Sequence, residues 1–262
     1  MKKMGTMKMV LCLMLAVTVL SACGDNKSEG DSKRKTIVMG TSADFPPYEF
    51  HKVVDGKDQV VGFDIEIAKQ IAADMDANLE IKDMNFESLL GELSTGRIDM
   101  VISGMTPKEE RKLQVDFSNN YYKAEQAVVV READKEKYNT MKALEGASFG
   151  IQNSSIQEDI AKTIPGAKIT GLSKISDIIM QLNSGRVDVS IMEKPVAEAY
   201  IKNVKGLVIT DAVPVNEEDG YAIGVKKGNK ELVKQINTTL DRLKSENKIE
   251  QFVSEASELS TK

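Results

Sequence analysis

Two stretches of this chain are imperfect copies of each other, and this duplication constrains the fold more than any other feature. Residues 93–107 read LSTGRIDMVISGMTP, and residues 182–195 read LNSGRVDVSIMEKP. Each copy predicts the end of a helix, a Gly-Arg turn, a short buried strand and a polar loop closed by proline. The first loop offers hydroxyl groups, whereas the second offers a carboxylate, Glu193. Two matching units that end in different polar groups indicate two lobes that face one ligand.

The residues around each copy repeat one pattern of secondary structure. Hydrophobic periodicity predicts strand, helix, strand, helix and strand over residues 36–103, and the same order again over residues 147–192. Such βαβαβ runs are typical of α/β proteins, in which helices cover the faces of a parallel sheet. Two apolar, β-like segments, residues 126–131 and 211–215, are interpreted as a hinge of two crossing strands between the lobes. The alternative, from the pattern alone, is one continuous sheet without a hinge.

The N-terminal residues predict a secretory signal. Three lysines precede an uncharged apolar run over residues 9–20, which is too short to span a bilayer. The sequence LSAC that ends at Cys23 resembles the bacterial lipobox, in which the cysteine receives a diacyl (palmitate-type) lipid and begins the mature chain. The alternative is an ordinary cleaved signal peptide with an incidental cysteine. Residues 24–35 contain no bulky apolar side chain and predict a flexible tether.

These observations predict four parts along the chain. Because 262 residues can bury the cores of two modest domains, we expect two folded lobes after the N-terminal segments. The expected parts are a signal peptide (1–22), a lipidated cysteine and flexible tether (23–35), a first lobe (36–127 plus 218–262) and a second lobe (128–217).

The composition excludes several classes of function. Removal of the signal peptide takes away three lysines and no acid, which changes the formal net charge from −5 to −8. We do not expect an acidic chain without a basic patch to bind nucleic acid. Cys23 is the one cysteine left after cleavage and His51 is the single histidine, so neither a disulfide framework nor a metal site is expected. No Ser/His/Asp triad, P-loop or GxGxxG sequence occurs, and we expect neither an enzyme nor a cofactor.

Polar residues follow the predicted strands of both halves, at the edge where open parallel sheets bind ligands. Residues 42–45 and 103–106 take these positions in the first half. Residues 153–155 and Glu193 take them in the second half. Phe45 lies in one of these loops beside two prolines, and we interpret it as a wall of a ligand pocket.

The loops also contain opposite charges, each with two interpretations. Thr106, Pro107 and Glu109 form a capping-box pattern, so Thr106 either caps a helix or contacts a ligand. Arg111, one turn further on, is either a solvated residue or a ligand for a carboxylate, which a guanidinium binds through two parallel hydrogen bonds. Glu193 either caps the next helix or attracts an ammonium group. An arginine on one lobe and an acid on the other match the two charges of an α-amino acid.

At this point the sequence resembles the bacterial extracellular solute-binding proteins of amino-acid ABC transporters, family 3. The matching stretches are residues 41–50, 62–72, 94–122, 150–158 and 184–200. The resemblance implies a two-lobed periplasmic-binding-protein-like fold of type II, which closes on a free amino acid and delivers it to a membrane permease. It also implies a monomer on the extracytoplasmic face of the cell membrane, anchored through Cys23 as in Gram-positive members.

The resemblance assigns the two ends of the amino acid to particular residues. By position, Arg111 holds the α-carboxylate, with help from the hydroxyl groups of Thr106 and Ser155. Backbone N–H groups of Gly104 and Ile156 complete that end of the site. The family's partner for the α-ammonium group is an acid after the second-lobe strand, here Glu193, together with the Gly104 carbonyl. Aspartate is more usual there, and Ser154 likewise stands where glycine is frequent.

The same resemblance assigns five positions to the pocket for the ligand's side chain. Phe45 and Phe86 match pocket walls, and Ser42, Met105 and Gln152 match positions that often read the side chain. Many members have aspartate at the position of Ser42, which weakens the case for a cationic ligand. Asp44 or Glu49 would restore the missing negative charge. Glutamine, arginine, histidine and cystine therefore all remain candidate ligands.

Two other functions are compatible with the same resemblance. Some similar proteins are dehydratases of cyclohexadienyl acids, and Glu193 would be the acid catalyst if burial raised its pKa. The other is a sensor domain that presents its ligand to a kinase.

Overall fold

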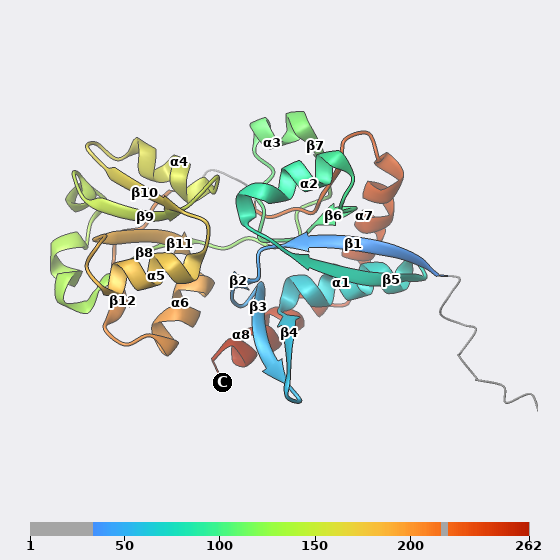
Figure 1. Cartoon of the computed structure of the whole chain (residues 1–262), viewed down its shortest axis with the longest axis horizontal. Coiled ribbons are helices and arrows are strands. Elements are labelled where there is room, and N and C mark those ends of the chain that lie inside the picture. Colours follow the sequence, from blue (N-terminus) through green and yellow to red (C-terminus); the bar gives the residue numbers. More distant parts are fainter. Residues whose placement is uncertain (1–33, 216–219, 262) are drawn as a thin grey trace, which may run out of the picture. The chain divides into compact units, whose positions relative to one another are not determined.

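The computed structural model describes residues 34–215 and 220–261 (Figure 1). The expected signal peptide, the lipidated Cys23 and the tether up to residue 33 lie outside the described residues. Among the helices that are described, none combines the length and the apolar character that crossing a membrane requires.

The first lobe is built on a five-stranded sheet. In spatial order its strands are β5 (Ala77–Asp83), β1 (Lys35–Thr41), β6 (Met100–Val101), β13 (Gly224–Lys226) and β7 (Val115–Phe117). β1 pairs in parallel with both β5 and β6, whereas β13 runs antiparallel to β6 and β7. The helices of this lobe are the 3-10 turn η1 (Phe86–Ser88), α1 (Phe63–Asp74), α2 (Leu89–Thr95), α3 (Glu109–Gln114), α7 (Lys230–Ser245) and α8 (Lys248–Ser260).

The second lobe repeats this plan. Its strands, in spatial order, are β10 (Lys168–Leu172), β9 (Ser148–Gln152), β11 (Val189–Glu193), β8 (Gln126–Arg131) and β12 (Leu207–Ile209). β9 is parallel to β10 and β11, and β8 is antiparallel to β11 and β12. Its helices are α4 (Ile156–Thr163), α5 (Ile175–Asn183), α6 (Lys194–Asn203), η2 (Glu132–Tyr138) and η3 (Met141–Leu144). The prediction of a two-lobed α/β fold is thus confirmed.

The two copies in the sequence have the same structure. Each runs from the end of a helix through a glycine at φ 76° or 75° into the third strand of its sheet. The aspartate of each copy holds the neighbouring strand in place. Asp99 Oδ2 accepts a hydrogen bond from the backbone N–H of Val38 at 2.8 Å, and Asp188 Oδ2 accepts one from the hydroxyl of Ser148 at 2.6 Å. These aspartates are therefore structural, and the strands they hold point their carboxyl ends toward the other lobe.

The chain passes between the two sheets twice, and the crossings differ from the prediction. Residues 126–131 form a strand as expected, but β8 lies inside the second sheet, and residues 118–125 make the crossing. The strand predicted over residues 211–215 is wrong, since this segment is irregular; Pro214 lacks the N–H that a strand ladder uses. The two crossings meet at one antiparallel bridge between Tyr122 and Tyr221.

A small sheet connects β1 to α1. It consists of β2 (Asp44–Phe45), β3 (Glu49–Val54) and β4 (Lys57–Val61), all antiparallel, with an Asp-Gly turn between β3 and β4. Gly62 follows β4 at φ 133°, where a Cβ atom would lie 2.0 Å from the carbonyl oxygen of Tyr48. Only glycine fits so close an approach. This contact holds β3 and the start of α1 together.

Candidate functional site

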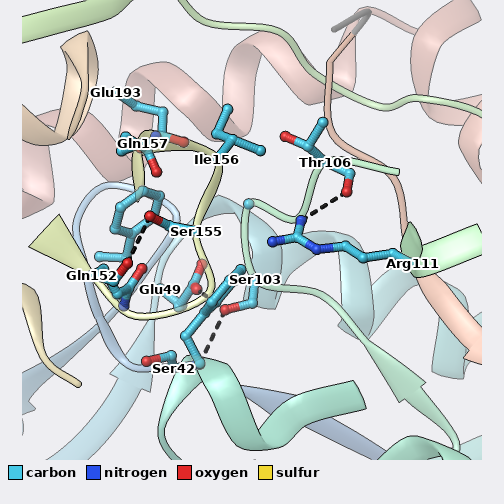
Figure 2. Close-up of a pocket in the computed structure, with 13 residues that line it drawn as sticks. Ser42, Glu49, Ser103, Thr106, Arg111, Gln152, Ser155, Ile156, Gln157 and Glu193 are labelled. Carbon is cyan, nitrogen blue, oxygen red and sulfur yellow. Dashed lines mark hydrogen bonds between the residues drawn. The ribbon is translucent and has the colours of Figure 1, made fainter. Parts of the chain in front are cut away.

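A pocket lies where the two copies end, at the carboxyl ends of β1 and β6 in one lobe and of β9 and β11 in the other (Figure 2). The empty space between its walls, part of it open to solvent, is about 320 Å³. The residues that line it are Ser42, Phe45, Glu49, Phe86, Ser103, Gly104, Thr106, Arg111, Gln152, Ser155, Ile156, Gln157 and Glu193. The polar side chains among them are at most 7% exposed, so charges in this pocket are shielded from water.

Ten of the eleven positions that the resemblance singles out lie in this lining, and Met105 is the exception. Its side chain is 1% exposed and belongs to an apolar cluster with Leu89, Val101 and Val115. Its backbone carbonyl accepts a hydrogen bond from the N–H of Ala222 at 2.9 Å. Met105 therefore shapes the loop that carries Gly104 and Thr106 and does not line the pocket.

Arg111 enters the pocket from the first turn of α3. One guanidinium nitrogen donates to the carbonyl of Thr106 at 2.8 Å, and the other donates to the carbonyl of Ser154 at 2.7 Å. The guanidinium also lies 5.4 Å from the ring centroid of Phe86, within the range of a cation–π contact. The bond to Ser154 reaches the other lobe. Arg111 is thus a buried cation that touches both sides of the pocket.

The helix that carries Arg111 also decides how Thr106 is used. α3 begins at Glu109, and its N-cap position is Lys108, which makes no side-chain capping bond. The capping-box interpretation, with Thr106 as N-cap, is therefore wrong, because the helix starts two residues later than the pattern predicts. The Thr106 side chain instead lines the pocket, where it is 2% exposed.

The first turn of α4 forms the second-lobe wall opposite Arg111. Ser155 is its N-cap: the hydroxyl accepts from the N–H of Glu158 at 3.2 Å and donates to the carbonyl of Gln152 at 2.8 Å. Ile156 and Gln157 follow in the lining. A helix N-terminus presents backbone N–H groups and a partial positive charge, so this wall favours an anionic group.

Ser154 precedes that cap and explains one departure from the family pattern. Its φ is 61°, a left-handed conformation in which glycine is favoured. Two hydrogen bonds hold it there: its N–H donates to Glu158 Oε2 at 2.8 Å, and its carbonyl accepts from Arg111. The position therefore still requires the glycine-like backbone, although the residue is a serine.

Glu193 is the last residue of β11 and closes the pocket from the second lobe. It occupies the N-cap position of α6 but makes no side-chain capping bond, so the capping interpretation is wrong. The hydroxyl of Tyr221 donates to Glu193 Oε1 at 3.4 Å, whereas Oε2 is buried with no hydrogen-bond partner among the described residues. Burial raises the pKa of Glu193 to about 7, because hydrogen bonds offset only part of the lost hydration. A cation in the pocket would find this oxygen available.

Glu49 is the lining residue of greatest consequence that sequence analysis did not place in the site. The sequence indicates Glu49 only as a source of negative charge, whereas the structure sets it in the pocket, 0% exposed, at the start of β3. The hydroxyl of Ser103, from the strand-end loop of residues 103–106, donates to Glu49 Oε1 at 2.5 Å. Burial raises the pKa of Glu49 well above its usual value, and the nearby Asp64 adds to this effect.

Asp44, the other candidate for that charge, does not line the pocket. Its Oδ2 accepts from the N–H groups of Ile175 and Ser176 at 2.6 and 3.3 Å, at the start of α5 in the second lobe. Its backbone carbonyl accepts from the hydroxyl of Tyr200 at 2.8 Å, again in the second lobe. Asp44 therefore caps a helix of one lobe from the other. Burial raises its pKa to about 6.

The remaining walls are aromatic or polar and are ordered by the loops that follow β1 and β6. The ring centroids of Phe45 and Tyr48 lie 5.0 Å apart. Gly104, at φ 50°, lets its loop pass close to Phe45, since a Cβ atom would lie 3.0 Å from that ring. The N–H of Ser42 donates to the hydroxyl of Ser103 at 3.1 Å, which links the two strand-end loops.

The described residues offer no metal centre. No group of three or more His, Cys, Asp or Glu side chains in residues 34–215 and 220–261 is arranged to hold an ion. His51 lies away from the pocket, with its ring nitrogens 2.8 and 3.2 Å from Asp58 and Asp83. The chemistry of the site is therefore that of a buried guanidinium and buried carboxyl groups around one small space.

Comparison with known proteins places this geometry in a family. A family model described as bacterial extracellular solute-binding proteins, family 3, matches residues 37–255. The arginine-binding extracellular protein ArtP of Bacillus subtilis is 37% identical over 258 residues, which is 96% of each chain. The glutamine-binding protein GlnH of the same organism is 28% identical, covering 93% of this chain and 94% of its own.

Solved structures of amino-acid-binding proteins show the same similarity. A Streptococcus pneumoniae substrate-binding protein bound to L-arginine matches 89% of this chain and 99% of its own, with 35% identity and a TM-score of 0.85. An ancestral arginine-binding protein bound to arginine matches 85% of this chain and 98% of its own, with 37% identity and a TM-score of 0.78. These proteins are all binding proteins, in agreement with the expectation that the chain is not an enzyme.

Proposed function

We propose that this chain, which belongs to the bacterial extracellular solute-binding proteins of family 3, is a receptor for free L-arginine. It works outside the cytoplasm, as its family does, and delivers the amino acid to the permease of an ABC transporter. One observation carries the choice of arginine: a buried guanidinium and two buried carboxyl groups, Arg111, Glu49 and Glu193, surround a single pocket of about 320 Å³.

The three charges of arginine match these three groups. Its α-carboxylate would pair with Arg111 and the N-terminal turn of α4, since a guanidinium binds a carboxylate through a two-pronged hydrogen bond. Its α-ammonium would pair with Glu193 Oε2, and its guanidinium with Glu49 Oε2; both oxygens are buried without hydrogen-bond partners among the described residues. Each ligand charge would then be neutralised in a pocket where an unpaired charge is costly.

The other lining residues fit supporting roles. Thr106 and Ser155 would add to the carboxylate end, together with the backbone N–H groups of Gly104 and Ile156. The rings of Phe45 and Phe86 would enclose the ligand's side chain, because a planar guanidinium packs well against aromatic faces. The remaining polar groups around the side chain would be Ser42, Gln152 and Gln157.

Glutamine is the rival ligand. A relative that is 28% identical is named as a glutamine-binding protein, and an ancestral protein 37% identical to this chain has a structure with glutamine. The carboxylate and ammonium sites would serve either amino acid. Glu49 favours arginine, because a guanidinium can pair with its carboxylate through charge-assisted hydrogen bonds, whereas a neutral amide makes only the weaker neutral ones.

Thermal denaturation tests the ligand directly. Protein freed of bound ligand by unfolding and refolding is heated with each of the twenty amino acids, citrulline or cystine. At a concentration of 100 times its dissociation constant, the correct ligand is expected to raise the melting temperature by about 5–10 °C. Arginine is expected to give the largest shift. A larger shift with glutamine would overturn the choice of arginine, and no shift with any amino acid would overturn the receptor function.

The two sheets are proposed to belong to lobes that close around the ligand. The proposed first lobe comprises residues 36–127 and 218–262, and the second comprises residues 128–217. The interlobe bonds of Arg111 and Asp44 support this picture, together with an ion pair between Lys108 and Asp159. A ligand that bridges Arg111 and Glu193 makes both contacts only when the lobes are closed, and it therefore shifts the population toward the closed form.

Asp44 is expected to act on this closing equilibrium. Replacing Asp44 with alanine removes the cap of α5, which typically contributes about 0.5–2 kcal/mol. Because the cap forms only between closed lobes, the affinity should fall by about 2- to 30-fold, and by the same factor for arginine and citrulline. Calorimetry measures both affinities. Asp44→Asn, which retains a capping oxygen, is the matched control and should lose less; a loss restricted to one ligand would contradict a role in closure.

The N-terminal assignments complete the proposal. Cys23 would carry a diacyl lipid at the outer face of a Gram-positive cell membrane, and the residues after it would tether a monomeric receptor near the permease. The support is the LSAC sequence and the apolar run before it. Mass spectrometry of the N-terminal peptide from membranes tests the lipid, which Cys23→Ala should abolish; an unmodified Cys23 in membrane-bound protein would disprove it. Light scattering tests whether the receptor is a monomer in solution.

A further inference from the structure

We propose that Glu49 and Asp64 share one proton when the pocket is empty, and that a cationic ligand side chain expels it. The protonation state of the pair would then depend on the charge of the ligand's side chain. This inference rests on the proposed binding of an amino acid in the pocket, and it adds an inner residue, Asp64, which does not line the pocket itself.

The two carboxyl groups are buried against each other. Glu49 comes from β3 and Asp64 from the first turn of α1, and each is 0% exposed. Glu49 Oε2 and Asp64 Oδ1 find no partner among the donors of the described residues. The two side chains are neighbours, since the N–H of Asp64 donates to the carbonyl of Tyr48 at 3.0 Å and the adjacent residues Ser103 and Gly104 donate to the two carboxyl groups. A hydrogen bond between the two carboxyl groups requires a proton on one of them. Two carboxylates in contact cannot both be ionised at low cost, so one shared proton satisfies both oxygens.

The surroundings fix which carboxyl holds the charge. Asp64 Oδ2 accepts from the N–H of Gly104 at 3.0 Å and from the hydroxyl of Tyr121 at 2.9 Å, two donors that favour its ionised form. Glu49 has one donor, the hydroxyl of Ser103. Burial raises the pKa of Asp64 to about 6 and raises that of Glu49 well above its usual value. At neutral pH the proton is therefore held mainly by Glu49.

The charged groups around the pair do not displace that proton in the empty protein. The side chains whose fields raise the pKa of Glu49 are Asp64 and Asp44, both acidic. Asp64 faces the hydroxyl of Tyr121 and the backbone of Gly104. Arg111 lies across the pocket, where it donates to the carbonyls of Thr106 and Ser154. Glu193 also lies across the pocket, and burial raises its pKa to about 7. A cation beside Glu49 must come from the ligand.

Binding then differs for charged and neutral side chains. A guanidinium beside Glu49 lowers the pKa of the pair, and the proton passes to the solvent. A neutral side chain leaves the proton in place, and Glu49 can donate it in a hydrogen bond to a urea or amide oxygen. Arginine and citrulline differ mainly in this charge, because a urea group replaces the guanidinium. Both bring the same α-ammonium group to Glu193, so protons released there cancel in the comparison.

Calorimetry of the full folded chain at pH 7, in buffers of different ionisation enthalpy, counts the protons released. Arginine is expected to release between about one half and one proton more than citrulline. Between pH 6 and pH 8 the affinity ratio of arginine to citrulline should rise, by at most about tenfold per pH unit for one proton. Equal proton release for the two ligands would overturn the shared proton while leaving arginine binding intact. Failure of arginine to bind would instead overturn the proposed function.

The variant Asp64→Asn tests whether the proton release depends on both carboxyl groups or on Glu49 alone. The asparagine oxygen can still accept from Gly104 and Tyr121, so the local fold has its acceptor, but the second negative charge is gone. Glu49 should then ionise more readily, and the extra release by arginine should fall, although burial continues to raise the pKa of Glu49. An unchanged release in this variant would show that Asp64 does not keep the proton on Glu49, and would overturn the shared proton. Should the variant fail to fold, the pH dependence of the wild-type affinity ratio decides: a flat ratio overturns the inference.

Discussion

Replacing Arg111 with alanine is expected to lower the affinity for L-arginine by about 30- to 4,000-fold, and to do so for every other amino acid that binds. The change corresponds to about 2–5 kcal/mol, as is typical when one partner of a buried, hydrogen-bonded charge pair is removed. Arg111 is 5% exposed, and the other polar side chains that line its pocket are also buried. The α-carboxylate of the ligand would therefore lose its partner without regaining its hydration. Isothermal titration calorimetry measures the loss.

Arg97 offers a matched control for this variant. It lies in the first copy, ahead of Arg111 in the sequence, but its side chain is 64% exposed and pairs with Glu92 on the surface. Arg97→Ala should leave the affinity within about twofold, since exposed ion pairs contribute about 0–1 kcal/mol to stability and this one lies outside the pocket. Arg111→Lys should recover only part of the affinity, because an ammonium lacks the two-pronged geometry. Near-wild-type binding by Arg111→Ala would remove the carboxylate site from the account.

Replacing Glu49 with glutamine is expected to weaken arginine binding by about 10- to 150-fold and citrulline binding by less than threefold. Hydrogen bonds to charged groups contribute about 1.5–3 kcal/mol, and the amide keeps the size of the side chain but not its charge. Glu49 lines the side-chain end of the proposed site, so the substitution should lower the affinity mainly for the cationic ligand. Calorimetric titrations of the variant with both ligands give the two losses.

A surface acid provides the control. Glu80 lies on β5, in the five-stranded sheet of the first lobe, with its side chain 52% exposed, and Glu80→Gln should change neither affinity. Equal losses for arginine and citrulline in Glu49→Gln would indicate that Glu49 supports the loop of Ser103 and does not read charge. The hydrogen bond from Ser103 makes that outcome physically reasonable, so the comparison of two ligands decides between the roles.

The sequence was sufficient to locate the pocket because its geometry follows from strand ends. The two copies predict where β6 and β11 end, and parallel strands bring their carboxyl ends to one edge. Ten positions carried over from the resemblance lie in the lining for this reason. Met105 does not, because a loop position shows where the backbone passes and not which way its side chain points. The side chain of Met105 turns into the core instead.

Other features depend on tertiary contacts that a local pattern does not contain. Asp64 reads as an ordinary first-turn acid of α1, and its contact with Glu49 arises only because β3 folds back against that helix. Asp44 is a helix cap whose helix lies 131 residues away in the sequence. The capping interpretations of Thr106 and Glu193 failed for a similar reason, because the helix starts and side-chain directions there are set by the pocket.

One L-arginine is expected to bind to each chain, in the pocket between Arg111, Glu49 and Glu193. Calorimetric titration of ligand-free protein with L-arginine measures both the stoichiometry and the affinity. We expect one site per chain, with a dissociation constant in the micromolar range or below and weaker binding of citrulline and glutamine. Protein that is folded but gives no binding with arginine, or that binds glutamine more tightly than arginine, would contradict it.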